Sequence, residues 1–210
     1  YAGSNITFSI TGRGEPSLHN NYRELLNYVI TNKNEKVKIL VNTNGYKFDQ
    51  YLDLYEKIER VSLNVYYNHT VEEYENLKKI YSNNKNITVC LRHIGNEITP
   101  QVQRQPYNNR AGTIENEITI INLEDNYCHK PFTNIFIDWN GDYNLCCNDW
   151  GEKIVLGNIA NESIIDYYTK NAELDFYKQM LKSNMRSIEP CASCNARCSP
   201  GFRHYFEKTH

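Results

Sequence analysis

Short apolar runs alternate with amphipathic stretches through the first half of the chain. The apolar runs predict strands at 6–10, 37–41, 61–66 and 87–91. Between them, apolar residues at helical spacing predict helices at 22–31, 49–58 and 71–81. The last of these helices opens with Thr70 and Glu73, a capping-box pattern. This βαβαβαβ order predicts an α/β fold with a parallel sheet or part of a (β/α) barrel.

The pattern changes in the second half of the chain. Residues 94–114 are rich in Asn, Gln, Pro and Gly and predict a long loop, followed by a further strand at 118–123. Residues 134–138 and 143–147 flank Asn140-Gly141 and predict a hairpin. Two further helices are predicted at 163–169 and 172–182. We therefore divide the chain into an α/β domain, 1–123, and a small hairpin-plus-helix domain, 124–210.

Composition and charge exclude several classes of protein. Of the 210 residues, 40% are hydrophobic and 12% aromatic, which excludes a disordered chain. The net charge of −2 gives no basic footprint for nucleic acid. No apolar run approaches the roughly 20 residues of a membrane helix, and no signal peptide is predicted. The chain begins with Tyr1 rather than Met, which predicts a start inside a gene product.

Cysteine is the informative residue type. The chain has seven cysteines, of which six lie at or beyond Cys128. An odd count, an adjacent pair and a Cys-x-x-Cys do not fit a secreted disulfide framework. They indicate a reducing, cytoplasmic compartment and thiolates kept for metal.

Four of these cysteines form a candidate metal site. Cys128 and Cys146 flank the predicted hairpin, and Cys191 and Cys194 lie on a tight turn after Pro190. Four thiolates from a hairpin and a loop suit either a tetrahedral zinc or a [4Fe–4S] cluster. The spacing alone does not separate the two metals.

The other three cysteines have simpler interpretations. Cys90 is expected to be a buried strand thiol. Cys147 follows a ligand on a predicted strand, so its side chain is expected on the opposite face and is not a ligand. Cys198 is an alternative ligand or a free thiol.

Two sets of residues resemble motifs of the radical S-adenosylmethionine (SAM) enzymes. Gly14-Glu15-Pro16 resembles their "GEP" motif after the second barrel strand, and Thr43-Asn44-Gly45 matches the "TNG" that follows the next strand. Cys128, Gly141 and Cys146, followed by the Cys-x-x-Cys, resemble the auxiliary-cluster domain called SPASM, or twitch in its shorter form. The resemblance covers nearly the whole chain. Because only Cys198 follows the Cys-x-x-Cys, the twitch form with one cluster fits better.

The resemblance implies a fold and a set of cofactors. It implies a partial (β/α)6 TIM-like barrel followed by a twitch/SPASM-like domain, with an auxiliary [4Fe–4S] cluster at the four cysteines and SAM as a bound cofactor. A second [4Fe–4S] cluster would be held by the family's Cys-x-x-x-Cys-x-x-Cys motif, which this chain lacks. Only eleven residues precede Gly12, so the first βα unit is expected to be omitted from the sequence; the alternative is a relative without that cluster. The resemblance also implies an electron donor such as flavodoxin or ferredoxin.

The resemblance assigns the SAM-binding residues to strand ends. Gly14, Glu15 and Pro16 would receive the SAM ammonium group, with Asn44 in the neighbouring motif; the alternative is an ordinary turn with a surface Glu. Ser62 and Asn64 would contact the SAM ribose or carboxylate, or else are polar filling of the barrel. Arg92 would pair with the SAM carboxylate, or else is a solvated strand end.

The loop Asn108-Asn109-Arg110-Ala111-Gly112 resembles one in the twitch-type aminocyclitol dehydrogenase group. That resemblance places Arg110 near a substrate hydroxyl, as a catalytic residue. The alternative is a loop Arg that caps a carbonyl.

Three functions follow from these observations. The first is a radical SAM oxidoreductase that generates a 5′-deoxyadenosyl radical and oxidises a sugar or aminocyclitol alcohol. The second is a radical SAM enzyme acting on a ribosomal peptide or protein side chain. The third is a non-catalytic structural module with zinc at the four thiolates. None of them involves a nucleic-acid or membrane partner.

Overall fold

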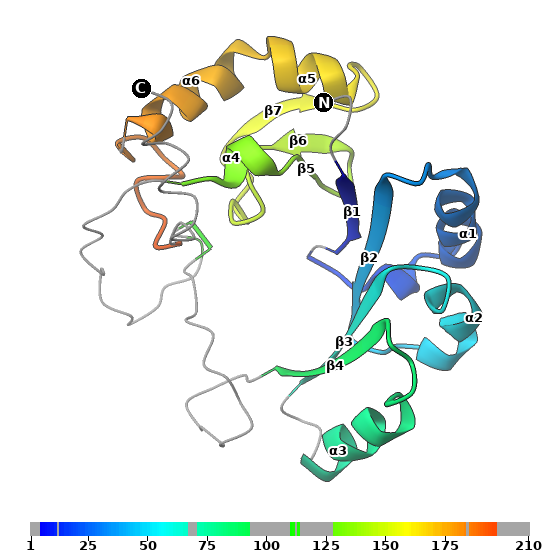
Figure 1. Ribbon diagram of the computed structural model, residues 1–210. Coiled ribbons are helices and arrows are strands. Elements are labelled where there is room, and N and C mark those ends of the chain that lie inside the picture. The colour runs from blue at the N-terminus through cyan, green and yellow to red at the C-terminus, as the bar shows by residue number, and fades with distance from the viewer. Residues whose placement is uncertain are drawn as a thin grey trace. The chain divides into compact units, whose positions relative to one another are not determined.

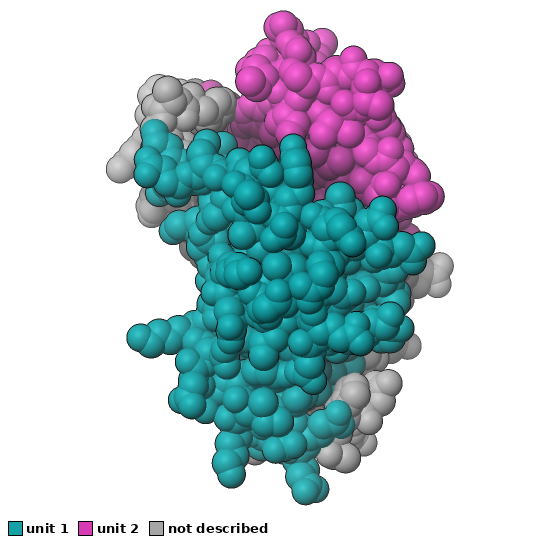
Figure 2. All heavy atoms as spheres, turned by 90° about the vertical axis from the view of Figure 1, so that its right-hand side faces the viewer, with its two compact units in different colours: residues 1–105 teal, residues 106–210 magenta. Residues whose placement is uncertain are grey.

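The computed structural model describes residues 5–11, 13–66, 71–92, 110–111, 113, 128–183 and 185–196. Its contacts divide the chain into two compact units, residues 1–105 and 106–210 (Figure 2). The sequence-based boundary between 123 and 124 stays a prediction, because residues 114–127 lie outside the described part.

A four-stranded parallel sheet forms the centre of the first unit. Its strands stand in chain order: β1 (Ile6–Ile10), β2 (Val37–Thr43), β3 (Arg60–Tyr66) and β4 (Ile87–Arg92). The connecting helices are α1 (Tyr22–Asn32), α2 (Leu52–Tyr55) and α3 (Val71–Ile80), with 3-10 turns η1 (Pro16–Leu18) and η2 (Phe48–Tyr51). All three α-helices cover the same face of the sheet (Figure 1). Strand side chains on the opposite face therefore point away from these three helices.

Apolar residues of the sheet meet the helices in one core. The register aligns Ile10, Val41, Val61 and Ile87 as a row across the strands, and Leu26 of α1 packs against this face. Burying such side chains contributes about 1.5–3 kcal/mol each. Since strand side chains alternate between faces, the same register puts the intervening residues of β3 on the other face.

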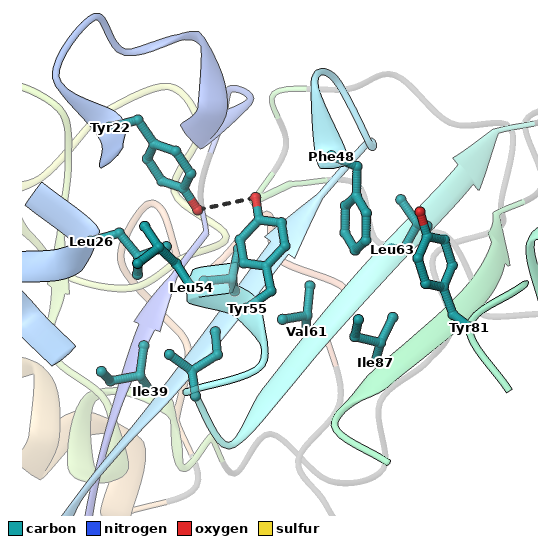
Figure 3. Close-up of a cluster of buried hydrophobic side chains, with 12 residues drawn as sticks. Tyr22, Leu26, Ile39, Phe48, Leu54, Tyr55, Val61, Leu63, Tyr81 and Ile87 are labelled. Atoms are coloured by element: carbon teal, nitrogen blue, oxygen red, sulfur yellow. Dashed lines mark hydrogen bonds between the residues drawn. The ribbon is translucent and has the colours of Figure 1, made fainter. Parts of the chain in front are cut away.

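Tyrosines complete this core with internal hydrogen bonds. The hydroxyl groups of Tyr22 and Tyr55 lie 3.4 Å apart between α1 and α2 (Figure 3). Burial raises the pKa of Tyr22 to about 12 and also raises the pKa of Tyr55. Tyr81 donates to the Asp49 carboxylate at 2.7 Å. These three tyrosines are thus part of the core.

The second unit contains a small antiparallel sheet and three helices. The strands are β5 (Phe136–Ile137), β6 (Asp142–Asn144) and β7 (Val155–Asn158), and the helices are α4 (Lys130–Thr133), α5 (Ile164–Lys170) and α6 (Ala172–Lys182). Tyr143 of β6 stacks on Tyr167 of α5 with ring centroids 4.1 Å apart. Leu174 and Leu181 of α6 are buried in the same core.

Local side chains explain where the elements of this unit turn. Asp138 accepts hydrogen bonds from the backbone N–H groups of Asn140 and Asp142, which closes the predicted Asn-Gly hairpin. Ser163 accepts from Asp166 N at 3.1 Å and caps α5. Asn171 caps α6 in the same way, accepting from Leu174 N at 2.9 Å.

The predicted elements need a few corrections. The helix predicted at 49–58 is a 3-10 turn followed by the short α2. The elements α4 and β7 were not predicted. The predicted strand 118–123 and the capping residue Thr70 lie outside the described residues. None of the described helices has the length and apolar character needed to cross a membrane.

Candidate functional site

Four cysteines from three segments of the second unit line one cavity. Cys128 lies just before α4, Cys146 in the turn after β6, and Cys191 and Cys194 in the turn after α6. The described cysteines form no disulfide. The rest of the lining is mainly apolar and includes Ala111, Pro131, Leu145, Leu181 and Pro190. The structure therefore brings together the four sequence-predicted metal ligands.

Two tight turns present the cysteine sulfur atoms to the cavity. Asp149 N donates to Cys146 O at 3.2 Å, and Cys194 N donates to Cys191 O at 3.2 Å. In each turn, the backbone N–H of the residue two positions after a cysteine points at the sulfur of that cysteine. Asn148 N–H bonds to the Cys146 thiol, and Ala196 N lies 3.4 Å from Cys194 Sγ. Such bonds favour the thiolate, which is the form that binds metal.

The buried carboxylate of Asp149 holds the first of these turns. The side chain is fully buried, and its two oxygens accept from Lys153 N at 3.1 Å and Ile154 N at 3.0 Å. Sequence reasoning missed this residue. An acidic residue followed by Gly151 in a turn-rich segment was the available signal.

The thiols are costly to ionise without a cation. Burial, together with the neighbouring cysteine thiols, raises the pKa of both Cys146 and Cys191 to about 12. These two thiols ionise readily only when a bound metal replaces their protons. Soft thiolates select zinc, copper(I) or iron–sulfur clusters. The donor set therefore fits the group predicted from the sequence.

Two cysteines differ from their predicted environments. Cys90 is half-buried rather than buried, and it lies on the face of β4 opposite the helix-covered core. Cys147 lies in the turn after β6 rather than on a strand. It is not part of the cavity lining, whereas its neighbours Cys146 and Asn148 are.

The predicted catalytic residue Arg110 lies beside this cavity. Its guanidinium carbon is 4.4 Å from the ring centroid of Trp150, a cation–π contact. The next residue, Ala111, is almost fully buried and lines the cavity itself, and its carbonyl accepts from Lys153 Nζ at 3.4 Å. Arg110 and Ala111 both have left-handed backbone conformations, with φ of 49° and 54°. Non-glycine residues keep such strained conformations where the surroundings hold them, often at functional sites.

In the first unit, Glu15 is placed differently from the simplest expectation. Its carboxylate accepts four hydrogen bonds: from Ser17 N and Oγ at 3.1 and 2.7 Å, from Thr43 Oγ1 at 2.8 Å and from Asn44 N at 2.6 Å. Three of these bonds reach Oε1 and one reaches Oε2, so most of the carboxylate's acceptor capacity is used within the protein. The Glu15 side chain thus joins the predicted "GEP" and "TNG" loops. The backbone at Gly14, where nothing lies within 4 Å of the position that a Cβ would take, is the part left open.

Steric crowding explains why position 45, in the "TNG" loop, is a glycine. Gly45 has φ of +90°, and a Cβ there would lie 2.8 Å from the Leu63 side chain. Its N–H donates to Thr43 Oγ1 at 3.0 Å, and Asn44 Oδ1 accepts from Tyr46 N at 2.9 Å. The loop that receives Glu15 is therefore closed by its own side chains.

The remaining predicted SAM contacts form one polar group on the sheet. Ser62 and Asn64 are buried neighbours on the face of β3 away from the helix core. Arg92 Nε donates to Asn64 Oδ1 at 2.7 Å, and Asn64 Nδ2 donates to Thr43 O and Ser62 O at 3.2 Å. The predicted residues of β3 and β4 are thus joined to the end of β2.

Replacing Glu15 tests whether its carboxylate holds the "GEP" and "TNG" loops together. Glu15→Gln converts one acceptor oxygen into a donor and leaves Asn44 N–H or the Thr43 hydroxyl without its acceptor. We expect a loss of about 1–3 kcal/mol. Both tryptophans lie in the second unit, so hydrogen exchange of the β1 and β2 amides is the suitable measurement. Exposed Glu24→Gln is the matched control, and equal exchange in both variants would contradict this role of Glu15.

Comparison with known proteins finds a similarity for the second unit. Residues 128–195 match SPASM, an iron-sulfur cluster-binding domain. The match spans all four cavity-lining cysteines. A search of curated protein sequences finds no match to the chain.

The chain also shares its fold with solved structures of BtrN. The structure of BtrN in complex with AdoMet and 2-DOIA matches with a TM-score of 0.69 at 20% identity, over 90% of this chain and 72% of that chain. An open conformation of selenomethionine BtrN matches with a TM-score of 0.60 at 19% identity, over 90% and 71%. The SPASM match agrees with the predicted auxiliary-cluster domain, and the likeness to BtrN confirms an α/β fold shared with an AdoMet-bound protein.

Proposed function

We propose that this chain is the larger part of a radical SAM oxidoreductase with one auxiliary [4Fe–4S] cluster in its second unit. The observation that carries the proposal is the cavity lined by Cys128, Cys146, Cys191 and Cys194 within the SPASM-matching segment. When bound, a cluster at this site supplies an acceptor for one electron.

The arrangement of the cysteines favours a cluster over a single zinc ion. Zinc draws four sulfurs to within about 2.3 Å of one point. The four cysteines line one cavity, and in a [4Fe–4S] cluster each thiolate binds a different iron. The match of this segment to an iron-sulfur cluster-binding domain favours the cluster over the zinc-module alternative.

The parallel sheet of the first unit supports SAM binding. Its strands follow one another in chain order with the helices on one face, as in part of a (β/α)6 barrel, where ligands bind at the carboxyl ends of the strands. Asn44, Asn64 and Arg92 lie at or near those ends, and the open backbone at Gly14 follows β1. We assign the SAM ammonium group to the backbone at Gly14 and Pro16, since the Glu15 carboxylate is already engaged. We assign the SAM carboxylate to Arg92, with Ser62 and Asn64 beside it.

An apolar surface beside β1 supports a further βα unit. Ile6 and Phe8 share a strand face with the core residue Ile10, yet they are 55% and 45% exposed. Leu25 and Tyr28 of α1 are exposed as well. We propose that a preceding βα unit covers this surface and carries the Cys-x-x-x-Cys-x-x-Cys motif with the second [4Fe–4S] cluster.

The proposed reaction is the oxidation of a secondary alcohol to a ketone. Bound SAM, reduced by one electron from a flavodoxin or ferredoxin, would supply a radical that takes the hydrogen atom from the carbinol carbon. The hydroxyl proton would leave as the ketone forms, and a cluster held by the four cysteines would accept the remaining electron. Arg110 hydrogen-bonds the substrate hydroxyl in this scheme. The bound AdoMet and 2-DOIA of the BtrN structure make an aminocyclitol or related sugar alcohol the first substrate class to test.

The deciding experiment is anaerobic turnover by the protein extended with its native upstream residues. We expect 5′-deoxyadenosine and ketone to form in equal amounts from SAM, reductant and 2-DOIA or a related alcohol. The products are measured by chromatography and mass spectrometry. Formation of 5′-deoxyadenosine only with a peptide substrate would favour the peptide-modifying alternative. If the protein contains zinc and no iron, the radical SAM proposal fails and the zinc structural-module alternative is favoured.

A further inference from the structure

Arg186 stands out among the residues around the cysteine cavity. It lies between α6 and the Cys-x-x-Cys turn, and its side chain lines the cavity with the four cysteines. Its Nη1 donates to Cys194 O at 3.1 Å, which fixes the guanidinium on the turn that carries two ligands. Sequence reasoning missed Arg186, because nothing in the spacing around it distinguishes it from a surface residue.

Arg186 brings a positive charge to the lining of the cavity. Apart from the cysteines, Arg186 is the one ionisable side chain among the described residues that line the cavity. The nearby Lys153 is neutralised by Glu189 at 3.1 Å. The hydrogen bond from Arg186 Nη1 to Cys194 O holds the guanidinium against the turn that carries Cys191 and Cys194. Arg186 is therefore close enough to favour negative charge on a cluster ligand.

A positive charge at this position has a definite redox effect. The potential of an iron–sulfur cluster depends on the net charge around it, on hydrogen bonds to its sulfurs and on its exposure. Reduction adds one negative charge, and in an apolar cavity a fixed cation stabilises that charge more than it would in water. A cluster beside Arg186 is thus easier to reduce.

We propose that Arg186 raises the reduction potential of the cluster held by the second unit, so that it accepts the electron released during substrate oxidation. The inference rests on the proposed function, which requires an electron-accepting auxiliary cluster. It adds a residue and a physical role that lie outside the four ligands. Arg186 acts here through the cluster and is not a catalytic residue.

The test is a redox titration of the reconstituted chain, in which electron paramagnetic resonance measures the amount of reduced cluster. Arg186→Gln removes the charge, Arg186→Met removes it while keeping an apolar stem, and Arg186→Lys retains it. We expect the two neutral variants to shift the equilibrium at least tenfold toward the oxidised cluster, which is about 59 mV for one electron. Arg186→Lys should lie closer to the wild type. Lys170→Gln, on the exposed surface of α5, removes a charge far less buried in the protein and should leave the potential unchanged.

Each outcome decides the proposal. An unchanged potential in neutral variants with full iron content overturns it. Loss of iron in both neutral variants also overturns it, because Arg186 would then hold the cluster rather than set its potential. A wild-type chain without an iron–sulfur cluster refutes the proposed function instead, so the two failures are distinguishable.

Discussion

Replacing Cys191 with serine is expected to abolish iron binding by the second unit. Cys191 is both a proposed ligand and a buried member of this unit's core, at 9% exposed. With three thiolates left in a largely apolar cavity, a cluster has no fourth sulfur ligand. Because metal binding and folding are coupled at such sites, we also expect the unit to lose stability. Iron and sulfide analysis after anaerobic reconstitution should fall from about four of each per chain to below one.

The matched control for this experiment is Cys90→Ser. Cys90 lies half-buried on β4 in the other unit, and its sulfur lies 3.8 Å from Thr88 O. Iron content should stay at the wild-type level in this variant. Equal loss of iron in both variants, or full iron in Cys191→Ser, would contradict the assigned ligand set. Tryptophan fluorescence reports on folding of the second unit, since Trp139 and Trp150 both lie there.

The sequence predicts the order of the elements well where apolar periodicity is strong. The strand at Ile6–Ile10 and the helix at Ala172–Lys182 have the predicted bounds. The alternation of strands and helices also predicts the parallel sheet, because parallel neighbours need a crossover connection. The spacing of the four cysteines predicts that they come together, and the structure places all four around one cavity; that they bind metal stays a prediction.

The missed elements have weak local signals. Strand β7, Val155–Asn158, contains Gly157 and Asn158, both unfavourable in strands, and is held by pairing with β6. Helix α4 has four residues and contains Pro131 near its start, too short for apolar periodicity to show. Tertiary contacts rather than propensity form both elements.

The side-chain roles that sequence reasoning missed depend on contacts between distant residues. Glu15 reads as a strand-end carboxylate, but its partner Thr43 lies 28 residues further on. Lys153 reaches the Ala111 carbonyl across 42 residues. Spacing within one segment cannot reveal such partners, and these contacts decide whether a polar side chain is left to bind a ligand or is used to hold the fold.

Replacing Arg110 with glutamine is expected to lower kcat/KM for the alcohol about tenfold to a hundredfold. A hydrogen bond from a charged donor contributes about 1.5–3 kcal/mol, and each 1.4 kcal/mol is a factor of ten. Iron content and SAM binding should not change, because the Arg110 side chain belongs to neither proposed site. The measurement is the rate of substrate-dependent 5′-deoxyadenosine formation by the upstream-extended protein.

Trp150 separates positioning of Arg110 from a purely structural role. Trp150→Phe keeps an aromatic face for the guanidinium, which lies 4.4 Å from the wild-type ring centroid, and should retain most activity. Trp150→Ala removes that face and should raise KM and lower kcat together, in the direction of Arg110→Gln. Arg23→Gln, at an exposed ion pair with Asp53, is the control for loss of an arginine elsewhere. If Arg110→Gln turns over the alcohol at the wild-type rate, the guanidinium has no part in the reaction, and its contact with Trp150 serves to hold the strained Arg110–Ala111 backbone against the cysteine cavity.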